Sequence, residues 1–174
     1  GRYISFELSH RPIPMYFPYM IKKLEYFVEK YGSLRDKIVK TNSPSKSFDF
    51  VETKDDTHSI PNIKTCKLNN DGPYFLYNYS DKACKFHGKR KVILSNKMYG
   101  IPYYDREGSY GISTRDNYLY IDKDNVKCER LFQYLNCNVI YFIYETTRYR
   151  MSYLEKYAFE FIPNIFTIPL DKIT

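Results

Sequence analysis

The sequence predicts a single α+β domain in which helices flank a small antiparallel sheet. Apolar residues recur at helical spacing near both ends of the chain, and short β-prone runs separated by glycines occupy its middle. With 174 residues, of which 43% are hydrophobic and 27% charged, the chain can bury one sizeable core and has a globular composition. We therefore expect one compact domain with three consecutive parts, residues 1–40, 41–72 and 73–174.

The first part, residues 1–40, is expected to contain a lead-in strand and two helices. From Pro18 onward apolar residues recur every three or four positions until Gly32, a residue type that commonly ends helices. Ser33 can then cap a second, short helix that runs through Val39. The lysines on the far side of the first helix are typical of a solvated face.

The middle part is polar, and the sheet is expected to follow it. Residues 41–72 are rich in Asn, Ser, Asp, Lys and Pro without a sustained period, which is typical of a long connection or insertion. The sheet should occupy residues 73–122, beginning with a strand at 73–77 and ending with the alternating run at 118–121. Residues 103–108 read as strand, tight turn and strand, because their glycine can supply a positive φ.

The last third of the chain is expected to be mainly helical. Asp124 or Asn125 can cap a helix that runs through Leu135. Residues 152–155 have the spacing of a capping box ahead of a final amphipathic turn. The tail at residues 165–169 can add an edge strand, because its proline falls at the end of the run.

Cationic and aromatic side chains gather in residues 89–122, a combination that suits nucleic acid. Arg106 and Arg115 each lie in a polar turn, from which an arginine can bond guanine bidentately, and Asn117 could address adenine. Turns are polar in most proteins, so ordinary solvated loops are the alternative. The candidate DNA-binding residues are Lys89, Arg90, Lys91, Lys97, Tyr103, Tyr104, Arg106, Tyr110, Arg115 and Asn117. Those before position 100 are the candidate phosphate contacts.

The order of several motifs carries a family likeness. A basic residue leads into Val-Ile-Leu-Ser at 92–95, Tyr-Tyr-Asp-x-x-Gly follows at 103–108, and a Leu-rich helix lies at 131–140. A tyrosine-containing helix and then Leu-Arg at 34–35 precede them, and Phe-Ile-Pro through Ile-Pro at 161–169 closes the chain. This order resembles the C-terminal target-recognition region of adenine-specific DNA methyltransferases, the TaqI-like class and the type IIG restriction-modification enzymes.

The resemblance implies a recognition module without a catalytic centre of its own. Its partners would be double-stranded DNA and a catalytic methyltransferase domain of the same polypeptide or complex, and the parent enzyme would use S-adenosylmethionine. The Asn/Asp-Pro-Pro-aromatic motif and the glycine-containing cofactor loop of that family do not occur in this sequence, so we expect no cofactor in this segment. The start at Gly1 instead of Met adds the expectation of a longer parent polypeptide or of a processed product.

Composition leaves two other classes of function open. The net charge of +7 favours polyanionic partners, but many basic domains bind none. The 20 tyrosines suit a protein-interaction or scaffold domain, for example a viral one, because tyrosine is favoured at interfaces. A nuclease using Asp105, Glu107 and Lys91 ranks last, because acidic residues in turns are common.

The cysteines and the hydropathy pattern indicate an intracellular protein of the cytoplasm or nucleoid. Cys66, Cys84, Cys128 and Cys137 lack regular spacing and a secretory signal, so reduced thiols are expected. Cys84 and His87 are three positions apart, but a structural zinc site normally needs four ligands, so we expect no metal. No apolar run approaches the roughly 18 residues of a membrane span.

Overall fold

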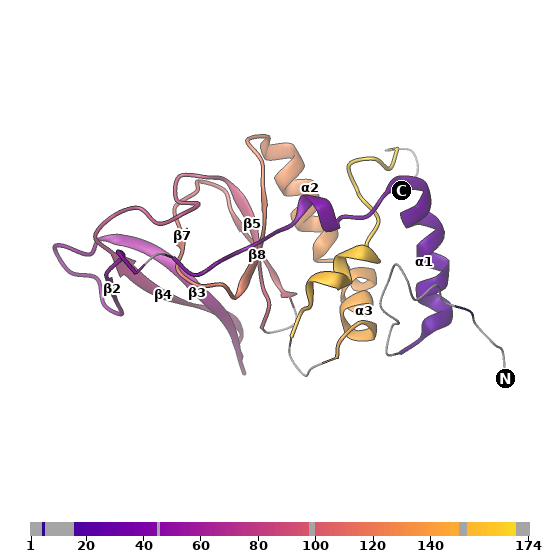
Figure 1. The fold of residues 1–174 in the computed structure, drawn as a ribbon, viewed down its shortest axis with the longest axis horizontal. Helices are drawn as coiled ribbons and strands as arrows, with labels where there is room; N and C mark the ends of the chain where they lie inside the picture. Colours follow the sequence, from indigo (N-terminus) through magenta and orange to yellow (C-terminus); the bar gives the residue numbers. More distant parts are fainter. Residues whose placement is uncertain (1–4, 6–15, 45, 98–99, 150–152, 170–174) are drawn as a thin grey trace.

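The structure is a computed structural model that describes residue 5 and residues 16–44, 46–97, 100–149 and 153–169. It confirms the predicted α+β class. Figure 1 shows the strands gathered at one end of the molecule and the helices at the other. Two four-stranded sheets take the place of the one small sheet that was expected.

Helices and strands occupy separate parts of the chain, because all eight strands in the described residues lie between α1 and α2. In order they are α1 (Pro18–Tyr31), the 3-10 turn η1 (Arg35–Lys37), β1 (Val39–Lys40), β2 (Phe50–Val51), β3 (Ile60–Asn69), β4 (Gly72–Ser80), β5 (Lys91–Ser95), β6 (Pro102–Asp105), β7 (Gly111–Ile112), β8 (Asn117–Ile121), α2 (Asn125–Leu135), α3 (Asn138–Thr146) and the 3-10 helix η3 (Lys156–Glu160).

The first sheet, here called the central sheet, has the strand order β1-β8-β5-β6 and is antiparallel throughout. The second, the outer sheet, has the order β2-β4-β3-β7. It is built on the long β3–β4 hairpin, to which β7 adds in parallel. The central sheet lies between the outer sheet and the helices, so both of its faces are covered (Figure 1).

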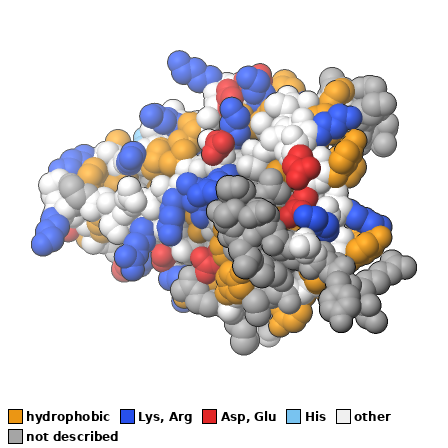
Figure 2. Space-filling model, turned by 45° about the vertical axis from the view of Figure 1, so that its right-hand side comes forward, with side chains coloured by type: hydrophobic (Ala, Val, Ile, Leu, Met, Phe, Trp, Pro, Cys, Tyr) orange, Lys and Arg blue, Asp and Glu red, His pale blue; other side chains and the backbone are white. Residues whose placement is uncertain are grey.

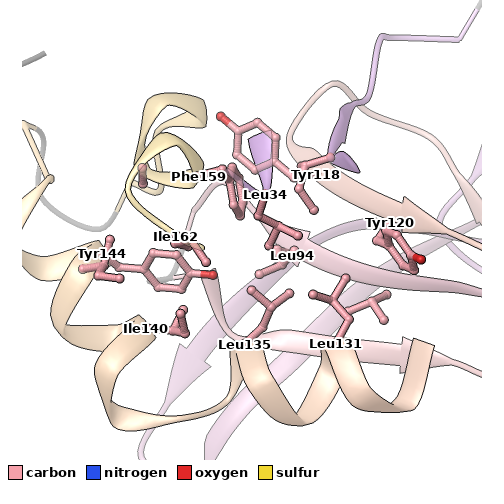
Figure 3. Packing of buried hydrophobic residues seen from close by; sticks show 14 of the residues in the cluster. Leu34, Leu94, Tyr118, Tyr120, Leu131, Leu135, Ile140, Tyr144, Phe159 and Ile162 are labelled. Carbon is pink, nitrogen blue, oxygen red and sulfur yellow. The ribbon is translucent and has the colours of Figure 1, made fainter. Parts of the chain in front are cut away.

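Alternating side chains of the central sheet supply two separate cores. Val92 and Leu94 of β5 pack with the helices, whereas Ile93 between them packs toward the outer sheet. Figure 3 shows Leu131 and Leu135 of α2 directed toward Leu94 in the helix-side core. Because both faces are buried, β5 reads in the sequence as an unbroken apolar run instead of an alternating one.

The two longest predicted helices are confirmed. Gly32 ends α1 with φ +78°, and its N–H donates to the Val28 carbonyl at 2.8 Å. The Asp124 carboxylate caps α2 by accepting from the N–H groups of Val126 and Lys127. The C-terminus of α1 and the N-terminus of α2 could be predicted from the sequence, because a helix cap depends on residues within one turn.

Several other elements differ from the prediction for reasons of tertiary pairing. Val39 leaves the expected second helix to join β1 opposite Leu119, so only a 3-10 turn remains. Residues 41–72 hold β2 and most of β3 in place of a structureless connection. The strand after the Gly108 turn is β7, which pairs in parallel with β3 and forms no hairpin with β6.

The C-terminal segment packs without a regular strand. Residues 165–167 form a turn, and isolated bridges pair Pro163 with Ser33 and Tyr153 with Lys97. Glu155 precedes η3 without a side-chain cap, while Ser152 of the expected capping box lies outside the described residues, as does most of the lead-in strand. No helix in the described ranges has the length and apolar character needed to span a bilayer.

A candidate nucleic-acid interface

A buried ion pair organises one end of the central sheet. Lys91 begins β5 directly opposite Asp105 at the end of β6, and its ammonium lies 2.5 Å from the Asp105 carboxylate. Lys91 Nζ also donates to the carbonyls of Phe86 at 3.1 Å and Lys89 at 3.0 Å. The Lys91 side chain has 0% exposed surface, so the prediction that it contacts phosphate is wrong.

The same pair ties two loops together. The Asp105 carboxylate accepts backbone N–H groups from Ser109 at 2.9 Å and Tyr110 at 3.1 Å, in the loop after β6. Burial lowers the pKa of Lys91, and the hydrogen bond that Lys91 donates to the Asp105 carboxylate opposes that shift. Because every partner is a charged or backbone group in a dry site, removing either side chain would leave an uncompensated charge.

Close backbone contacts also hold these two loops together, and we call the resulting arrangement of loops the frame. Gly88 donates its N–H to the Gly108 carbonyl at 2.8 Å, and a Cβ on Gly108 would lie only 2.6 Å from the Lys89 nitrogen. Gly108 has φ +70°, a value that glycine adopts without strain. Phe86 adopts φ +74° although it is not glycine, with its ring buried between the sheets. The backbone of residues 86–89 is thereby held against the loop after β6.

The frame presents several cations around a groove of about 660 Å³, which we call the Lys89 end. It is lined by Gly88, Lys89, Arg90, Arg106, Glu107, Ile121, Asp122 and Lys123. Arg90 is fixed, because its guanidinium donates to the carbonyls of Arg106 at 3.0 Å and Lys123 at 2.8 Å. Arg106 bonds Glu129 at 2.7 Å and lies over the Tyr104 ring at 5.2 Å. Lys89 and Lys123 are exposed.

The opposite end of the central sheet carries a second, more polar groove of about 570 Å³, which we call the Arg115 end. It is lined by Lys40, Ser43, Asn96, Lys97, Ser113, Thr114, Arg115, Asp116 and Tyr153. Lys97 pairs with Asp116 at 2.8 Å. Arg115 is exposed, and its side chain makes no hydrogen bond or ion pair with any residue that the structure describes. It is the freest arginine of the predicted set.

The two arginines predicted to read bases therefore lie far apart. Arg106 follows β6 beside the start of β5, whereas Arg115 precedes β8 beside the end of β5. At about 3.3 Å per residue, the length of β5 separates the two ends by roughly 15 Å. Both turns project from one sheet, as predicted, but from opposite ends of it.

Comparison with known proteins does not assign the chain to a family. No family model, curated protein or solved structure matches this chain. The likeness to methyltransferase target-recognition regions therefore stays a hypothesis about motif order.

Asn117 and Tyr104 are structural. Asn117 has 0% exposure, and its amide donates to the Lys64 carbonyl at 3.2 Å and the Thr114 hydroxyl at 3.3 Å, so the prediction that it reads adenine is wrong. The Tyr104 hydroxyl donates to Asn125 Oδ1 at 2.6 Å, and its ring belongs to the helix-side core. Tyr104 is therefore not available to stack on a base.

Tyr103 and Tyr110 are half-buried and occupied by other rings. Tyr110 stacks on Tyr77 with centroids 5.4 Å apart, and Tyr103 lies 4.6 Å from Phe75. Burial, with a contribution from the neighbouring Tyr110, raises the pKa of both Tyr77 and Tyr103 to about 12. These ring contacts join the outer sheet to β6 and to the loop that follows it.

Metal-binding side chains do not converge in the part of the chain that the structure describes, where no group of three His, Cys, Asp or Glu could hold an ion. Cys66, Cys84 and Cys128 are free and buried, and burial raises the pKa of each thiol. The alternative that Asp105, Glu107 and Lys91 form a nuclease site is not supported, because Lys91 and Asp105 are buried against each other and cannot reach a substrate.

The grooves contain cations that the sequence interpretation missed. Lys40 follows the expected second helix, which was to end at Val39, but as part of β1 it lies at the Arg115 end. Lys123 lies two residues after the end of β8 and joins the Lys89 end. Its position two residues after a predicted strand was the available signal, whereas the signal for Lys40 depended on the β1–β8 pairing.

Proposed function

We propose that this domain binds nucleic acid, in the first place duplex DNA, as the target-recognition module of an adenine-specific methyltransferase or restriction-modification enzyme. The observation that carries the proposal is the presence of exposed cations at both ends of the central sheet. Lys89 and Lys123 at one end and Arg115 at the other form no ion pair with a described residue. Figure 2 shows Lys and Arg side chains spread over the strand-rich part of one face.

The spacing of the two ends is compatible with one duplex. A separation of roughly 15 Å corresponds to about four or five base pairs, because one strand rises about 3.4 Å per base. Phosphates would be neutralised at the Lys89 end, where Arg90 is already fixed by two carbonyls. The free guanidinium of Arg115 would then reach a base edge, for which guanine offers two acceptors.

Chemistry would come from the partner domain. The motif order supports a role next to a catalytic domain that holds S-adenosylmethionine, and the sequence of this segment lacks that family's catalytic and cofactor motifs. Lys97 keeps a supporting role, since its ion pair with Asp116 positions the loop that carries Arg115. The proposal therefore assigns affinity and sequence preference, and no reaction, to this chain.

The test is a titration of a fluorescent duplex by anisotropy at several salt concentrations. Two to four neutralised phosphates predict a log-log slope of about −2 to −4, at about −0.9 for each phosphate. The double variant Lys89→Ala, Lys123→Ala removes two exposed cations of the Lys89 end and should make the slope about 2 less steep. Lys54→Ala, an exposed lysine in the loop between β2 and β3, is the matched control and should change nothing.

Two results would overturn the proposal. One is a dissociation constant weaker than about 10⁻⁴ M at low salt, which is the weak limit of nonspecific DNA binding. The other is binding that does not respond to salt. Competition by single-stranded DNA and by duplex RNA decides which polyanion is preferred.

A further inference from the structure

Exposed apolar side chains concentrate at the helical end of the molecule, away from both basic grooves. Seven of the large exposed ones belong to α1, to the residues just before it or to α3: Tyr16, Phe17, Tyr19, Met20, Tyr26, Phe27 and Val139. The others, Val39, Tyr74, Val126 and Tyr149, belong to separate segments of the chain. A contiguous exposed apolar patch usually marks an interaction surface, whereas single exposed residues need no explanation.

A groove of about 350 Å³ runs between α1 and α3 inside this patch, and we call it the α1–α3 groove. It is lined by Met20, Lys23, Leu24 and Phe27 of α1 and by Asn138, Val139 and Phe142 of α3. Phe17 contacts Phe142 with ring centroids 5.7 Å apart and so bridges the two helices at one end.

Helix α1 carries two apolar stripes. Ile21 and Val28 are buried in the fold, as a core-facing stripe requires. Met20, Leu24 and Phe27 stand at the spacing i, i+4, i+7 beside them and line the groove, with Phe27 45% exposed. In this second stripe Leu24 packs in part against the helix-side core, whereas Met20 and Phe27 stay nearly half exposed and gain little from folding.

The charge around the groove is positive. Lys23 lines it, and Lys30 stands two turns further along the same face of α1. Their ammonium groups lie over the rings of Tyr19 at 4.8 Å and Tyr31 at 5.3 Å and have no carboxylate partner among the described residues. The seven lining residues include no acid.

We propose that the α1–α3 groove docks an amphipathic helix of a partner protein, with apolar residues at i, i+4 and i+7 and with Asp or Glu beside them. The concave shape favours a helix, since helices bind in grooves through such anchors. A second copy of this chain would bring the same lysines against each other, and like charges disfavour that contact. A membrane would require a protruding apolar surface and not a hollow one.

The test uses two synthetic helical peptides that share leucines at i, i+4 and i+7 and differ only in having Glu or Lys at the flanking positions. The acidic peptide should bind the intact domain by anisotropy or calorimetry, and the basic peptide should not. Phe27→Ser should weaken the acidic peptide at least about tenfold, close to 1.4 kcal/mol. Val126→Ser removes an exposed apolar residue of α2 that lies outside the groove and should leave binding unchanged.

Charge reversal supplies a second readout. Lys23→Glu should turn the preference toward the basic peptide, and circular dichroism should show that the variant remains folded. Failure of the acidic peptide to bind at roughly 100 μM, or binding that Phe27→Ser leaves intact, overturns the proposal. The proposal is also overturned if the domain self-associates or binds anionic vesicles and Phe27→Ser abolishes that binding. The groove would then hold a second copy of the chain or a membrane surface instead of a partner helix. Lys89→Ala should not affect peptide binding, so this inference and the DNA proposal fail separately.

Discussion

The two ends of the central sheet differ in how they hold their cations. At the Lys89 end, Arg90 is bonded to two carbonyls, Arg106 is bonded to Glu129, and the loops rest on a buried ion pair. At the Arg115 end, the arginine has no partner among the described residues. The Lys89 end is therefore preorganised for binding. The Arg115 side chain would lose conformational entropy when it binds.

This difference suggests a division of labour. A fixed cation loses little freedom when it meets a phosphate, and phosphates present the same target at every sequence. A free arginine can adjust to a base edge, and it forms two hydrogen bonds only where the two acceptors of guanine are present. We therefore expect changes at the Lys89 end to alter general affinity and changes at the Arg115 end to alter sequence preference.

The largest effect should come from breaking the buried pair. Lys91→Met removes the ammonium and leaves the Asp105 carboxylate buried, which should reduce the free energy of unfolding by about 3–5 kcal/mol. Denaturant unfolding measures this. The Lys89 end should lose its shape before the Arg115 end does, because only the former rests on the pair.

The double variant Lys91→Met, Asp105→Asn sharpens the same prediction. If the charges act as a pair, the combined loss should be smaller than the sum of the two single losses. Additive losses would mean that each side chain is held by its backbone partners alone, which would contradict the role given to the ion pair.

Next in size is a comparison of two glycines with the same backbone angle. Gly88 and Gly108 both have φ +70°, but a Cβ on Gly88 meets nothing within 4 Å. Gly88→Ala should cost about 1–2 kcal/mol for the left-handed conformation alone. Gly108→Ala should cost about 1–3 kcal/mol more, because the new methyl overlaps the backbone of Lys89. Equal thermal shifts would refute the close contact.

Single arginine changes should separate the two ends in binding. On a duplex selected from a random pool, Arg115→Ala should lose about 1–3 kcal/mol of the preference for the selected sequence. Arg106→Ala should lose less, because that guanidinium is engaged with Glu129. Lys89→Ala should weaken all duplexes alike and lower the salt slope by about 1. An Arg106 effect larger than that of Arg115 would reverse the assignment.

The smallest effect concerns pH and lies in the outer sheet. The hydrogen bond to Asp55 raises the pKa of His58 above 6.5, and the backbone bond from His58 lowers the pKa of Asp55. Stabilisation by His58 is thus present below pH 6.5 and lost as pH rises through its raised pKa. NMR titration should show this shift, and His58→Gln should abolish the pH response of the loop. DNA affinity between pH 6 and 8 should stay constant, since lysine and arginine remain charged there.

Local signals in the sequence predicted local features correctly. The helix caps at Gly32 and Asp124 could be predicted because they depend on residues within one turn. The run from Val92 to Leu94 could be assigned to a buried strand because it is apolar and rich in β-branched residues. The cationic loops at Lys89 and Arg115 were found in the same way, as polar residues adjoining strands.

Features decided by distant pairing could not be predicted. Residues 60–69 mix polar and apolar positions, and a register shift between Ile63 and Thr65 interrupts the alternation, so the sequence showed no strand there. The strand β7 is only two residues long. Lys91 looks like any exposed lysine until Asp105, fourteen residues away, is placed opposite it. Asn117 likewise looked accessible because its partner, the Lys64 carbonyl, belongs to the segment that was interpreted as a connection.

The most direct test of the central claim is a map of the DNA contact on the protein. Amide chemical shifts of the isotope-labelled domain, recorded while a short duplex is added at low salt, report which residues are affected. We predict perturbations at both ends of the central sheet, around residues 88–90 and 121–123 and around residues 113–116, with α1 and α3 unchanged. Perturbations confined to α1 and α3, or absent altogether, would contradict the account.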